Sequence, residues 1–332
     1  MGLLRRVPSE DIDVFVFDSI FMAHLVNEGC LLPIPDEKIQ DRKDILPFAL
    51  SACTVDDKVY ALPQLLCANV LCTRKGDSEL NGVTNVAQLH EVLGDHTYEE
   101  VISSDKGLLM DLTGNTTKTL SYLQALMDYE QRYQTEFPAL TGDTLSKKAE
   151  DSLLSLIAMG ASWSDEGLED AGPYHHAELF AKGAGRAYIG FSEALSAMGD
   201  YADNVDVRLI SMADGHDLPV FYADFAGINA HIDEANKDAA FDLLNLITGS
   251  ETMTAAIAGT AENPHPQYLL PARSSVYSAL AKSYPQYDRL KELVETAGAQ
   301  VMQLMPDGRS YLEQYKRVLG NEIETESTGS HS

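Results

Sequence analysis

Cys67 is the residue whose type and setting most directly suggest covalent chemistry. It lies in the segment 58–76, KVYALPQLLCANVLCTRKG, after a run that contains Pro63. Because proline lacks an N–H, Pro63 is expected to interrupt the strand, so the thiol would lie where one short strand gives way to another at 68–72 and could face a cleft. The alternative is that Cys67 is a small buried hydrophobe. A nucleophilic thiol would need a base or a local field that favours the thiolate.

Three further side chains are expected at strand positions that can face a ligand. Asp18 follows the run 12–17, IDVFVF, which predicts a buried parallel strand with an acid at its carboxyl end, where ligands gather in open α/β sheets. In the run 220–229, VFYADFAGIN, Tyr222 and Asp224 share one face at the two-residue period of a strand. The alternatives are a solvated loop carboxylate for Asp18 and an ordinary half-buried strand for the other two residues.

The segment 174–200 contains a second group of candidates. Tyr174 is expected at the start of a helix, and Phe191 at the end of a strand over 186–191. Glu193 then begins another helix. Each position also has an ordinary explanation, since acids are favoured in the first turn of a helix by the macrodipole and a tyrosine at a helix start is common.

A metal site is not expected. His175 and His176 are adjacent, and neighbouring positions on a helix diverge by about 100°, so both cannot readily bind one ion. We therefore expect solvated histidines at this helix start. The four cysteines, at positions 30, 53, 67 and 72, lack the spacing of a zinc site or a redox pair, so no disulfide framework is expected either.

The elements that must position these residues alternate between strand and helix, which predicts an α/β protein. Strands are expected at 12–17, 59–62, 68–72, 107–112, 186–191, 205–212 and 220–229. Helices are expected at 19–28, 44–50, 85–94, 117–133 and 143–159. Everything after Asp233 has a helical pattern, apart from breaks at glycines and prolines, and 324–332 is expected to be a frayed tail.

Length and charge limit the classes of function. A chain of 332 residues with 45% hydrophobic residues predicts about two folded domains. The formal net charge of −27 argues against nucleic acid or an anionic membrane as a partner. A cationic ligand would be tolerated, although diffuse acidity more often serves solubility. No stretch approaches the roughly 18 apolar residues of a spanning helix, and Met1 to Arg6 is too short for a signal peptide.

Two motifs resemble segments of the thiaminase I (thiamine pyridinylase) family. They are Pro63-Gln-Leu-Leu-Cys67-x-Asn69 and Tyr188-Ile-Gly-Phe-Ser-Glu193, and the resemblance extends over nearly all of 10–323. It implies the two-lobed fold of type II periplasmic solute-binding proteins, with a ligand cleft between the lobes. By this analogy, lobe one contains 1–68 and 219–270, lobe two contains 69–218 and 271–323, and 324–332 is a disordered tail.

The resemblance also implies roles in catalysis. Cys67 would be the nucleophile that adds to the pyrimidine of thiamine, and Glu193 would be the base that deprotonates it. The thiazole would then leave, and another base or nucleophile would take its place before the cysteine is expelled. No metal or organic cofactor is implied.

Five further positions match residues that line the substrate pocket of the family. Asp18 and Asp224 would bond the exocyclic amine and the ring nitrogen of the aminopyrimidine. Tyr222 would line the same pocket, and Tyr174 would pack on the substrate. Phe191 stands where the family has a tyrosine, which keeps the stacking surface and loses a hydroxyl.

The implied partners are thiamine and a small nucleophilic co-substrate, such as an aromatic amine, a pyridine or a thiol. The family resemblance further implies a secreted or periplasmic monomer without nucleic acid or membrane partners. Two alternatives stay open: a non-catalytic solute-binding protein for thiamine or a related small cation, and an inactive or partial duplicate.

Family members have an additional strand, a helix and the start of another strand before the segment that matches Ile12. That piece supplies aromatic residues to the cleft, whereas this chain begins almost at the second strand. Removal of the segment, a gene model that is too short and a drift in function are the open explanations. A lobe one that lacks it would expose the side of a hydrophobic strand. We therefore expect poor solubility or an altered sheet edge for this form.

Overall fold

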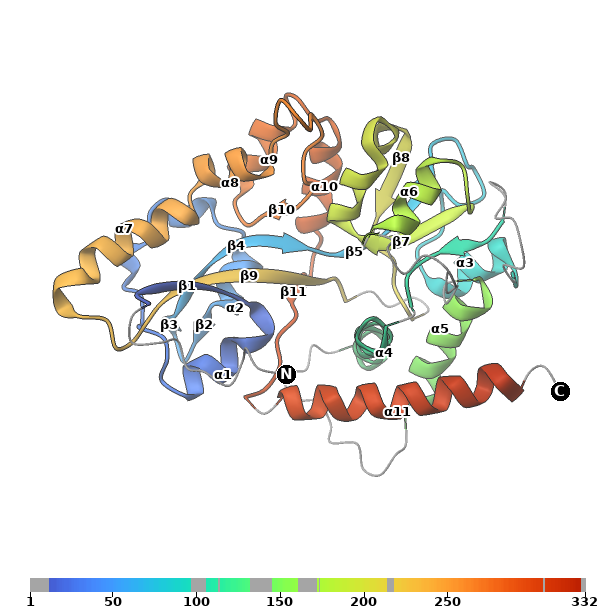
Figure 1. Ribbon diagram of the computed structural model, residues 1–332, viewed down its shortest axis with the longest axis horizontal. Helices are drawn as coiled ribbons and strands as arrows, with labels where there is room; N and C mark the ends of the chain where they lie inside the picture. Colours follow the sequence, from blue (N-terminus) through green and yellow to red (C-terminus); the bar gives the residue numbers. More distant parts are fainter. Residues whose placement is uncertain are drawn as a thin grey trace. The chain divides into compact units, whose positions relative to one another are not determined.

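The computed structural model describes residues 12–96, 106–112, 114–131, 145–160, 172, 174–213, 218–306 and 308–329. The chain forms two compact units (Figure 1). Unit 1 contains Met1–Cys67 and Val220–Asp307, and unit 2 contains Ala68–Pro219 and Gly308–Ser332. The α/β class is confirmed. The chain passes from unit 1 to unit 2 after Cys67 and returns after Pro219, each within a residue or two of the predicted boundary.

The C-terminal division differs from the prediction. Residues 271–307, expected in lobe two, belong to unit 1. The reason is a two-residue strand, β10 (Leu270–Pro271), which pairs with β4 (Ala61–Cys67) in the sheet of unit 1. Helix α9 (Ser274–Leu280) follows β10 and contacts it, so it also belongs to unit 1. Helix α10 (Gln286–Val294) packs on α9 in turn.

The sheet of unit 1 is built around β9 (Val220–Ile228), which lies between β1 (Val14–Asp18) and β4 (Figure 1). Both neighbours run antiparallel to β9, and the short strand β11 (Gln300–Val301) pairs parallel to its start. The helical pattern predicted after Asp233 did not anticipate β10 and β11. Two residues are too few to show a strand period.

Strand β1 corrects the prediction of a buried parallel strand at 12–17. Its register with β9 is antiparallel and runs from Val14 opposite Ile228 to Asp18 opposite Asp224. It is the end strand of the described order, none of its five residues is buried, and Val16 is 50% exposed. An apolar run at an end strand has a single neighbour, so the VFVF pattern alone does not mark the centre of a sheet.

Strand β4 corrects a second prediction, because Pro63 does not end it. The strand is continuous, and its register with β9 shifts between Pro63 and Leu65. Gln64 is the extra residue, and its Nε2 donates to the carbonyl oxygen of Ile247 at 2.8 Å. Such a bulge accommodates a residue without an N–H while the pairing resumes beyond it, so Cys67 stays in the ladder.

The remaining described helices and strands of unit 1 surround this sheet. They are η1 (Ser19–Phe21), α1 (Met22–Asn27), η2 (Asp36–Lys38), η3 (Arg42–Asp44), α2 (Pro47–Ala52), β2 (Thr54–Val55), β3 (Lys58–Val59), η5 (Glu234–Asn236), α7 (Lys237–Ile247) and α8 (Ser250–Ile257). The helix predicted at 19–28 is split between η1 and α1, and the one predicted at 44–50 lies at 47–52.

The sheet of unit 2 has the order β6 (Leu108–Leu109), β7 (Ala187–Phe191), β5 (Asn69–Arg74) and β8 (Val205–Arg208). Strand β5 pairs antiparallel with both β7 and β8, whereas β6 and β7 are parallel. The strands predicted at 107–112 and 205–212 therefore exist but are shorter.

Six described helices accompany this sheet: α3 (Val86–Leu93), α4 (Asn115–Glu130), α5 (Lys147–Ala158), α6 (His175–Ala181), η4 (Ser192–Asn204) and α11 (Gly308–Gly329). The start predicted for the helix at 85–94 is confirmed, since the Asn85 side chain caps α3 by accepting from the Gln88 amide at 2.8 Å. Helix α11 packs on α4 and continues to Gly329, so the expected frayed tail is helical up to that residue. Residues 330–332 lie outside the described part of the chain.

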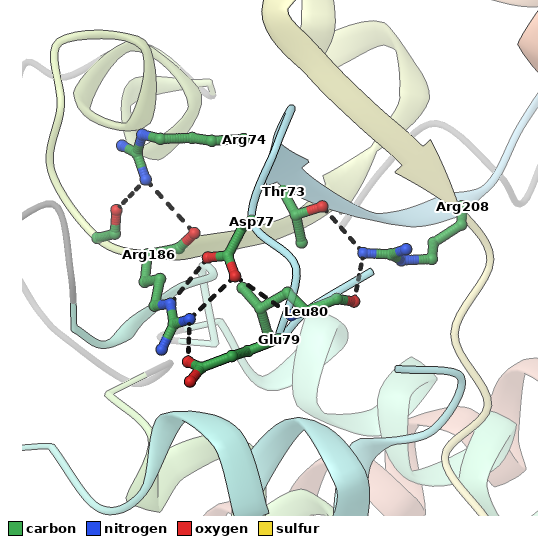
Figure 2. Close-up of polar contacts among 8 residues, drawn as sticks. Thr73, Arg74, Asp77, Glu79, Leu80, Arg186 and Arg208 are labelled. Carbon is green, nitrogen blue, oxygen red and sulfur yellow. Dashed lines mark hydrogen bonds and ion pairs between the residues drawn. The ribbon is translucent and has the colours of Figure 1, made fainter. Parts of the chain in front are cut away.

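An ion pair holds the loop that follows β5 (Figure 2). The Arg186 guanidinium donates to both carboxylate oxygens of Asp77 at 2.9 Å each and to Glu79 at 2.6 Å. The Asp77 side chain also accepts from the Leu80 amide at 3.2 Å. The hydrogen bonds from Arg186 hold the pKa of the Asp77 carboxyl below its ordinary value. We name Asp77, Glu79 and Arg186 the loop ion-pair cluster.

Two more arginines fasten the same region to the sheet (Figure 2). Arg74 donates to the carbonyl oxygens of Phe180 and Gly185, at 3.0 and 2.5 Å, and lies 4.2 Å from the centre of the Phe180 ring. Arg208 donates to the Thr73 hydroxyl at 2.9 Å and to the Leu80 carbonyl at 2.8 Å. This end of β5 is thus fixed by half-buried cations that already have acceptors.

Among the residues that the structure describes, no helix is long and apolar enough to cross a membrane.

Candidate functional site

In unit 1, the predicted site residues come together on one face of the sheet. Cys67 on β4 pairs with Tyr222 on β9, and Asp18 on β1 pairs with Asp224 on β9. Residues directly opposite each other on antiparallel strands project from the same face, and Tyr222 and Asp224 share that face by their spacing. The predicted common face of Tyr222 and Asp224 is therefore confirmed, and we call these four residues the unit 1 face.

The unit 1 face is the less buried side of this part of the sheet. Cys67 and Tyr222 are half-buried, and Asp18 and Asp224 keep substantial contact with solvent. Their neighbours Leu66, Ala223 and Phe225, which alternate to the other face, are at most 5% exposed. One side of the sheet therefore belongs to the core, and the other presents a thiol, a phenol and two carboxylates.

Cys67 differs from the other three cysteines. Cys30, Cys53 and Cys72 are buried free thiols, whereas Cys67 is half-buried. Burial raises the pKa of all three buried thiols, to about 12 for Cys72 and well above the ordinary range for Cys53. Cys67 therefore differs from the other three cysteines in keeping solvent-accessible surface.

The two carboxylates of the unit 1 face have raised pKa values. Both residues retain solvent-accessible surface, yet enough protein surrounds each carboxyl to disfavour its charge. Burial raises the pKa of Asp18, and hydrogen bonds from the Ile20 amide, at 3.0 Å, and from Ser19 offset part of the increase. For Asp224, burial is again the largest cause, and the negative charge of Asp18 adds to it. Such a pair is suited to a ligand edge that presents a positive charge or several N–H donors.

In unit 2, the predicted residues lie where β7 gives way to η4. Phe191 ends β7 opposite Asn69, and the amide of Ser192 donates to the carbonyl oxygen of Ala68 at 3.0 Å. Glu193 occupies the first turn of η4, as predicted, and its Oε2 lies 3.5 Å from the Ser192 hydroxyl. The half-buried Glu193 is therefore placed by a strand end and a buried serine.

Tyr174 is the N-cap residue of α6, which confirms its predicted place at a helix start. Helix α6 packs against β6, β7 and η4, so Tyr174 belongs to the same part of unit 2 as Glu193. His175 and His176 are half-buried, which corrects the expectation of solvated histidines. Over the described ranges, no group of three or more His, Cys, Asp or Glu side chains is arranged to hold a metal ion.

Two further residues of unit 2, Tyr188 and Asp111, were not assigned from the sequence. Tyr188 on β7 is 5% exposed, and the pKa of its phenol is raised mainly by burial and further by the charges of Cys72, Glu193, Tyr174 and Asp111. Asp111 follows β6 as Asp18 follows the apolar run of β1, so an acid after a strand was an available signal. Tyr188 lies inside the quoted motif that ends at Glu193 but had no feature of its own to distinguish it.

Comparisons with known proteins identify what this chain is similar to. The Thiaminase-1 domain model matches residues 68–213. A thiaminase-1 from Paenibacillus thiaminolyticus is 41% identical over 315 residues, which are 94% of this chain and 76% of that protein. The solved structure of Clostridium botulinum thiaminase I in complex with thiamin matches with a TM-score of 0.89 and 38% identity, over 96% of this chain and 88% of that one.

A more distant similarity concerns the fold alone. The maltose-bound MalE3 of T. maritima matches with a TM-score of 0.61 at 18% identity, over 93% of this chain and 78% of that one. The fold class is therefore the two-lobed type II binding-protein fold, as predicted.

Proposed function

Because this chain belongs to the thiaminase I family, we propose that Cys67 and Glu193 are the nucleophile and the base of its reaction. The chain is a thiamine-degrading transferase that exchanges the thiazole of thiamine for another base. The assignment of individual residues to that exchange is the proposal, and it is supported by the chemistry of the two residue groups described above.

One observation supports the pairing of Cys67 with Glu193 most strongly. Ala68, which is bonded to Cys67, accepts the hydrogen bond from Ser192, which is bonded to Glu193. Consecutive Cα atoms are about 3.8 Å apart, so the covalent chain limits how far the thiol can move from this point. The bond lies inside unit 2, and Cys67 is the last residue of unit 1. This hydrogen bond is therefore an observation that does not depend on how the two units are placed.

The exchange then follows in balanced steps. Glu193 takes the proton of Cys67, and the thiolate adds to C6 of the pyrimidine. The bond between the bridging methylene and the thiazolium nitrogen breaks, and its electron pair leaves with the neutral thiazole. The acceptor then forms a bond to the methylene, and the cysteine is expelled as a thiolate, which takes its proton back from Glu193. An acceptor with an N–H or S–H loses that proton, whereas a pyridine becomes a pyridinium.

The unit 1 face would bind the pyrimidine. Asp18 and Asp224 would accept hydrogen bonds from the exocyclic amine and a protonated ring nitrogen, which are donors on one edge of the ring. Tyr222 would line the ring next to the thiol. In unit 2, Tyr174 and Phe191 would contribute aromatic surface, and the absence of a hydroxyl at Phe191 would leave stacking as its contribution.

The same proposal extends to the setting of the reaction. We infer that the acceptor is a small nucleophile such as an aromatic amine, a pyridine or a thiol, and that the protein acts as a secreted or periplasmic monomer. Neither nucleic acid nor a membrane would take part. The acidic surface is compatible with a cationic substrate, because negative charge does not repel a thiazolium.

The test is thiamine consumption with and without an added aromatic amine, combined with intact-protein mass spectrometry. We expect turnover that depends on the amine, and a pyrimidine adduct on the Cys67 peptide when the acceptor is withheld. Cys67→Ser should abolish both signals, and Glu193→Gln should reduce turnover by at least about 100-fold. Cys30→Ser, which alters a buried thiol of the same unit, is the matched control and should keep activity.

Other outcomes would contradict the assignment. An active Cys67→Ser variant, or an adduct that maps to another residue, would exclude Cys67 as the nucleophile. Tight, reversible thiamine binding without turnover in the unmodified protein would instead indicate a solute-binding carrier on the same fold.

A further inference from the structure

We propose that Tyr188 is a positioning residue for Glu193: its phenol and the Ser192 hydroxyl form a row of donors that ends at the Glu193 carboxylate. The inference rests on the proposed function, since it assumes that Glu193 acts as the base. It concerns how that base is held and tuned, which the family relationship by itself does not specify.

The first support is the place of Tyr188 in the sheet of unit 2. It pairs with Cys72 on β5 and with Leu109 on β6, so it has a strand on each side, and it is 5% exposed. Its ring also packs near Phe180, with the ring centres 6.2 Å apart. A side chain held in this way has little rotational freedom, so its hydroxyl keeps a defined position.

The second support is the direction of the ring along β7. Gly190 lies two residues after Tyr188 and therefore on the same face. A Cβ placed on Gly190 would lie 1.9 Å from the Tyr188 hydroxyl and 2.4 Å from the ring carbon that bears it. The phenol thus occupies the space that a side chain at 190 would fill. It extends along the strand toward the end where η4 begins.

The third support is the residue that comes next on that face. Phe191 has extended backbone angles, φ −66° and ψ 148°, so the alternation of the strand continues to Ser192. Ser192 is fully buried, and its hydroxyl lies 3.5 Å from Oε2 of Glu193. Along this face of the strand, Tyr188 comes first, then Gly190, whose side-chain space the phenol fills. Ser192 follows and lies beside the Glu193 carboxylate.

The charges around Tyr188 decide which group in this row keeps its proton. Burial, with the neighbouring negative charges of Cys72, Glu193, Tyr174 and Asp111, raises the pKa of the Tyr188 phenol well above its ordinary value. The phenol therefore keeps its proton, and in the proposed row it would donate toward Ser192 and the Glu193 carboxylate. A donor that stabilises the charged form of a carboxylate lowers the pKa of that carboxylate, so Tyr188 would keep Glu193 ionised and ready to accept the thiol proton.

The test is the pH profile of kcat in Tyr188→Phe, which removes one hydroxyl and keeps the ring. We expect the acidic limb to move to higher pH by about 0.5 to 1 unit, since the carboxylate loses a donor. At pH 6 kcat should fall about 3- to 10-fold, while KM for thiamine should stay within about twofold, because the residue acts through Glu193 and not through the substrate. The rate of Cys67 alkylation by iodoacetamide as a function of pH is a second readout, independent of turnover.

A second variant separates position from chemistry. Gly190→Ala keeps the phenol but adds a methyl group where the hydroxyl lies, so it should displace the hydroxyl and shift the same limb in the same direction. The shifts of Gly190→Ala and Tyr188→Phe should not add in the double variant. Tyr201→Phe is the matched control, because Tyr201 also packs on Phe180 and should leave the profile unchanged.

The outcomes distinguish this inference from the proposed function. A Tyr188→Phe profile that superposes on that of the unmodified protein, together with an inactive Glu193→Gln, would overturn the positioning role and leave Glu193 as the base. Full activity in Glu193→Gln would overturn the proposed function and this inference together. Equal shifts in Tyr188→Phe and Tyr201→Phe would indicate a general packing effect and would also overturn the inference.

Discussion

The acids of the unit 1 face and those of the loop ion-pair cluster have opposite surroundings. Asp77 and Glu79 receive charge-assisted hydrogen bonds from Arg186, and the pKa of Asp77 is lowered. Asp18 and Asp224 lie opposite each other, and burial raises the pKa of both. Within the described ranges, no lysine, arginine or histidine forms an ion pair with either of these two.

The difference is the one expected between residues that stabilise the fold and residues that bind a ligand. A paired acid lowers the free energy of the folded state on its own, whereas two crowded acids without a cation raise it. A protein keeps such a cost where a function requires it, and a ligand with an amidine-like edge would relieve it. The unit 1 face therefore fits a binding role, and the loop ion-pair cluster fits a structural one.

The largest expected effect comes from neutralising Asp224. Asp224→Asn should lower kcat/KM for thiamine by roughly 100-fold, because a charge-assisted contact to the pyrimidine is lost. The same change should leave the melting temperature equal or higher, since it removes a crowded charge. Steady-state kinetics and thermal unfolding on one preparation test both statements.

The matched control is Asp238→Asn, which changes an exposed acid of the same unit that pairs with Lys38. It should change neither kcat/KM nor stability measurably, because exposed ion pairs contribute little. If Asp224→Asn unfolds at a lower temperature and retains its kcat/KM, the division into binding and structural acids is wrong.

Part of this site could be predicted from sequence because local rules determine it. The period of two residues placed Tyr222 and Asp224 on one face, and the register confirms it. The helix predicted from residue 85 does begin there, and the hydrogen bond from the Gln88 amide to the Asn85 side chain confirms it. In each case the sequence feature and the structural feature involve the same few residues.

Other features depend on partners that are distant in sequence. The antiparallel pairing of β1 is decided by β9, and the bulge at Gln64 by the register that β4 must keep beyond Pro63. The setting of Tyr188 depends on the missing side chain at Gly190. The pattern of a single run contains none of this information, so a glycine two residues after a tyrosine looked unremarkable.

A smaller effect is expected from breaking the loop ion-pair cluster. Arg186→Gln should reduce the free energy of unfolding by about 1 to 3 kcal/mol, since it leaves the partly buried Asp77 carboxylate without its guanidinium donor. Arg186→Lys should recover only part of this loss, because an ammonium cannot donate to both oxygens in the same geometry. Urea denaturation measures the change, and kcat/KM of the folded protein should stay within about twofold.

Lys38→Gln provides the comparison for Arg186→Gln. It breaks an ion pair whose side chains are 42% and 88% exposed, and it should leave the free energy of unfolding unchanged within experimental error. An equal loss in both variants would mean that partial burial does not strengthen the Arg186 pair. A large loss of kcat/KM in Arg186→Gln would instead connect the cluster to the active site.

The smallest expected effect is a difference in how stability depends on pH. Asp77 has a lowered pKa, so its contribution is present above its ordinary value of 3.8 and is lost as the pH falls below it through the folded-state pKa. Asp224 has a raised pKa, so its cost is absent at low pH and develops as the pH rises from 3.8 through the folded-state value. The pH dependence of stability that Asp77 causes therefore lies below pH 3.8, and that caused by Asp224 lies above pH 3.8.

Asp77→Asn and Asp224→Asn should separate these two contributions. The destabilisation by Asp77→Asn should shrink below pH 3.8, whereas the relative stabilisation by Asp224→Asn should grow above it. Each slope is limited to about 1.4 kcal/mol per pH unit, the value for one proton. Urea denaturation from pH 3 to pH 7 gives both curves. Parallel curves for the two variants would show that the pairing of Asp77 with Arg186 and the crowding of Asp224 beside Asp18 have no different effect on stability. The electrostatic distinction between the unit 1 face and the loop ion-pair cluster would then be wrong.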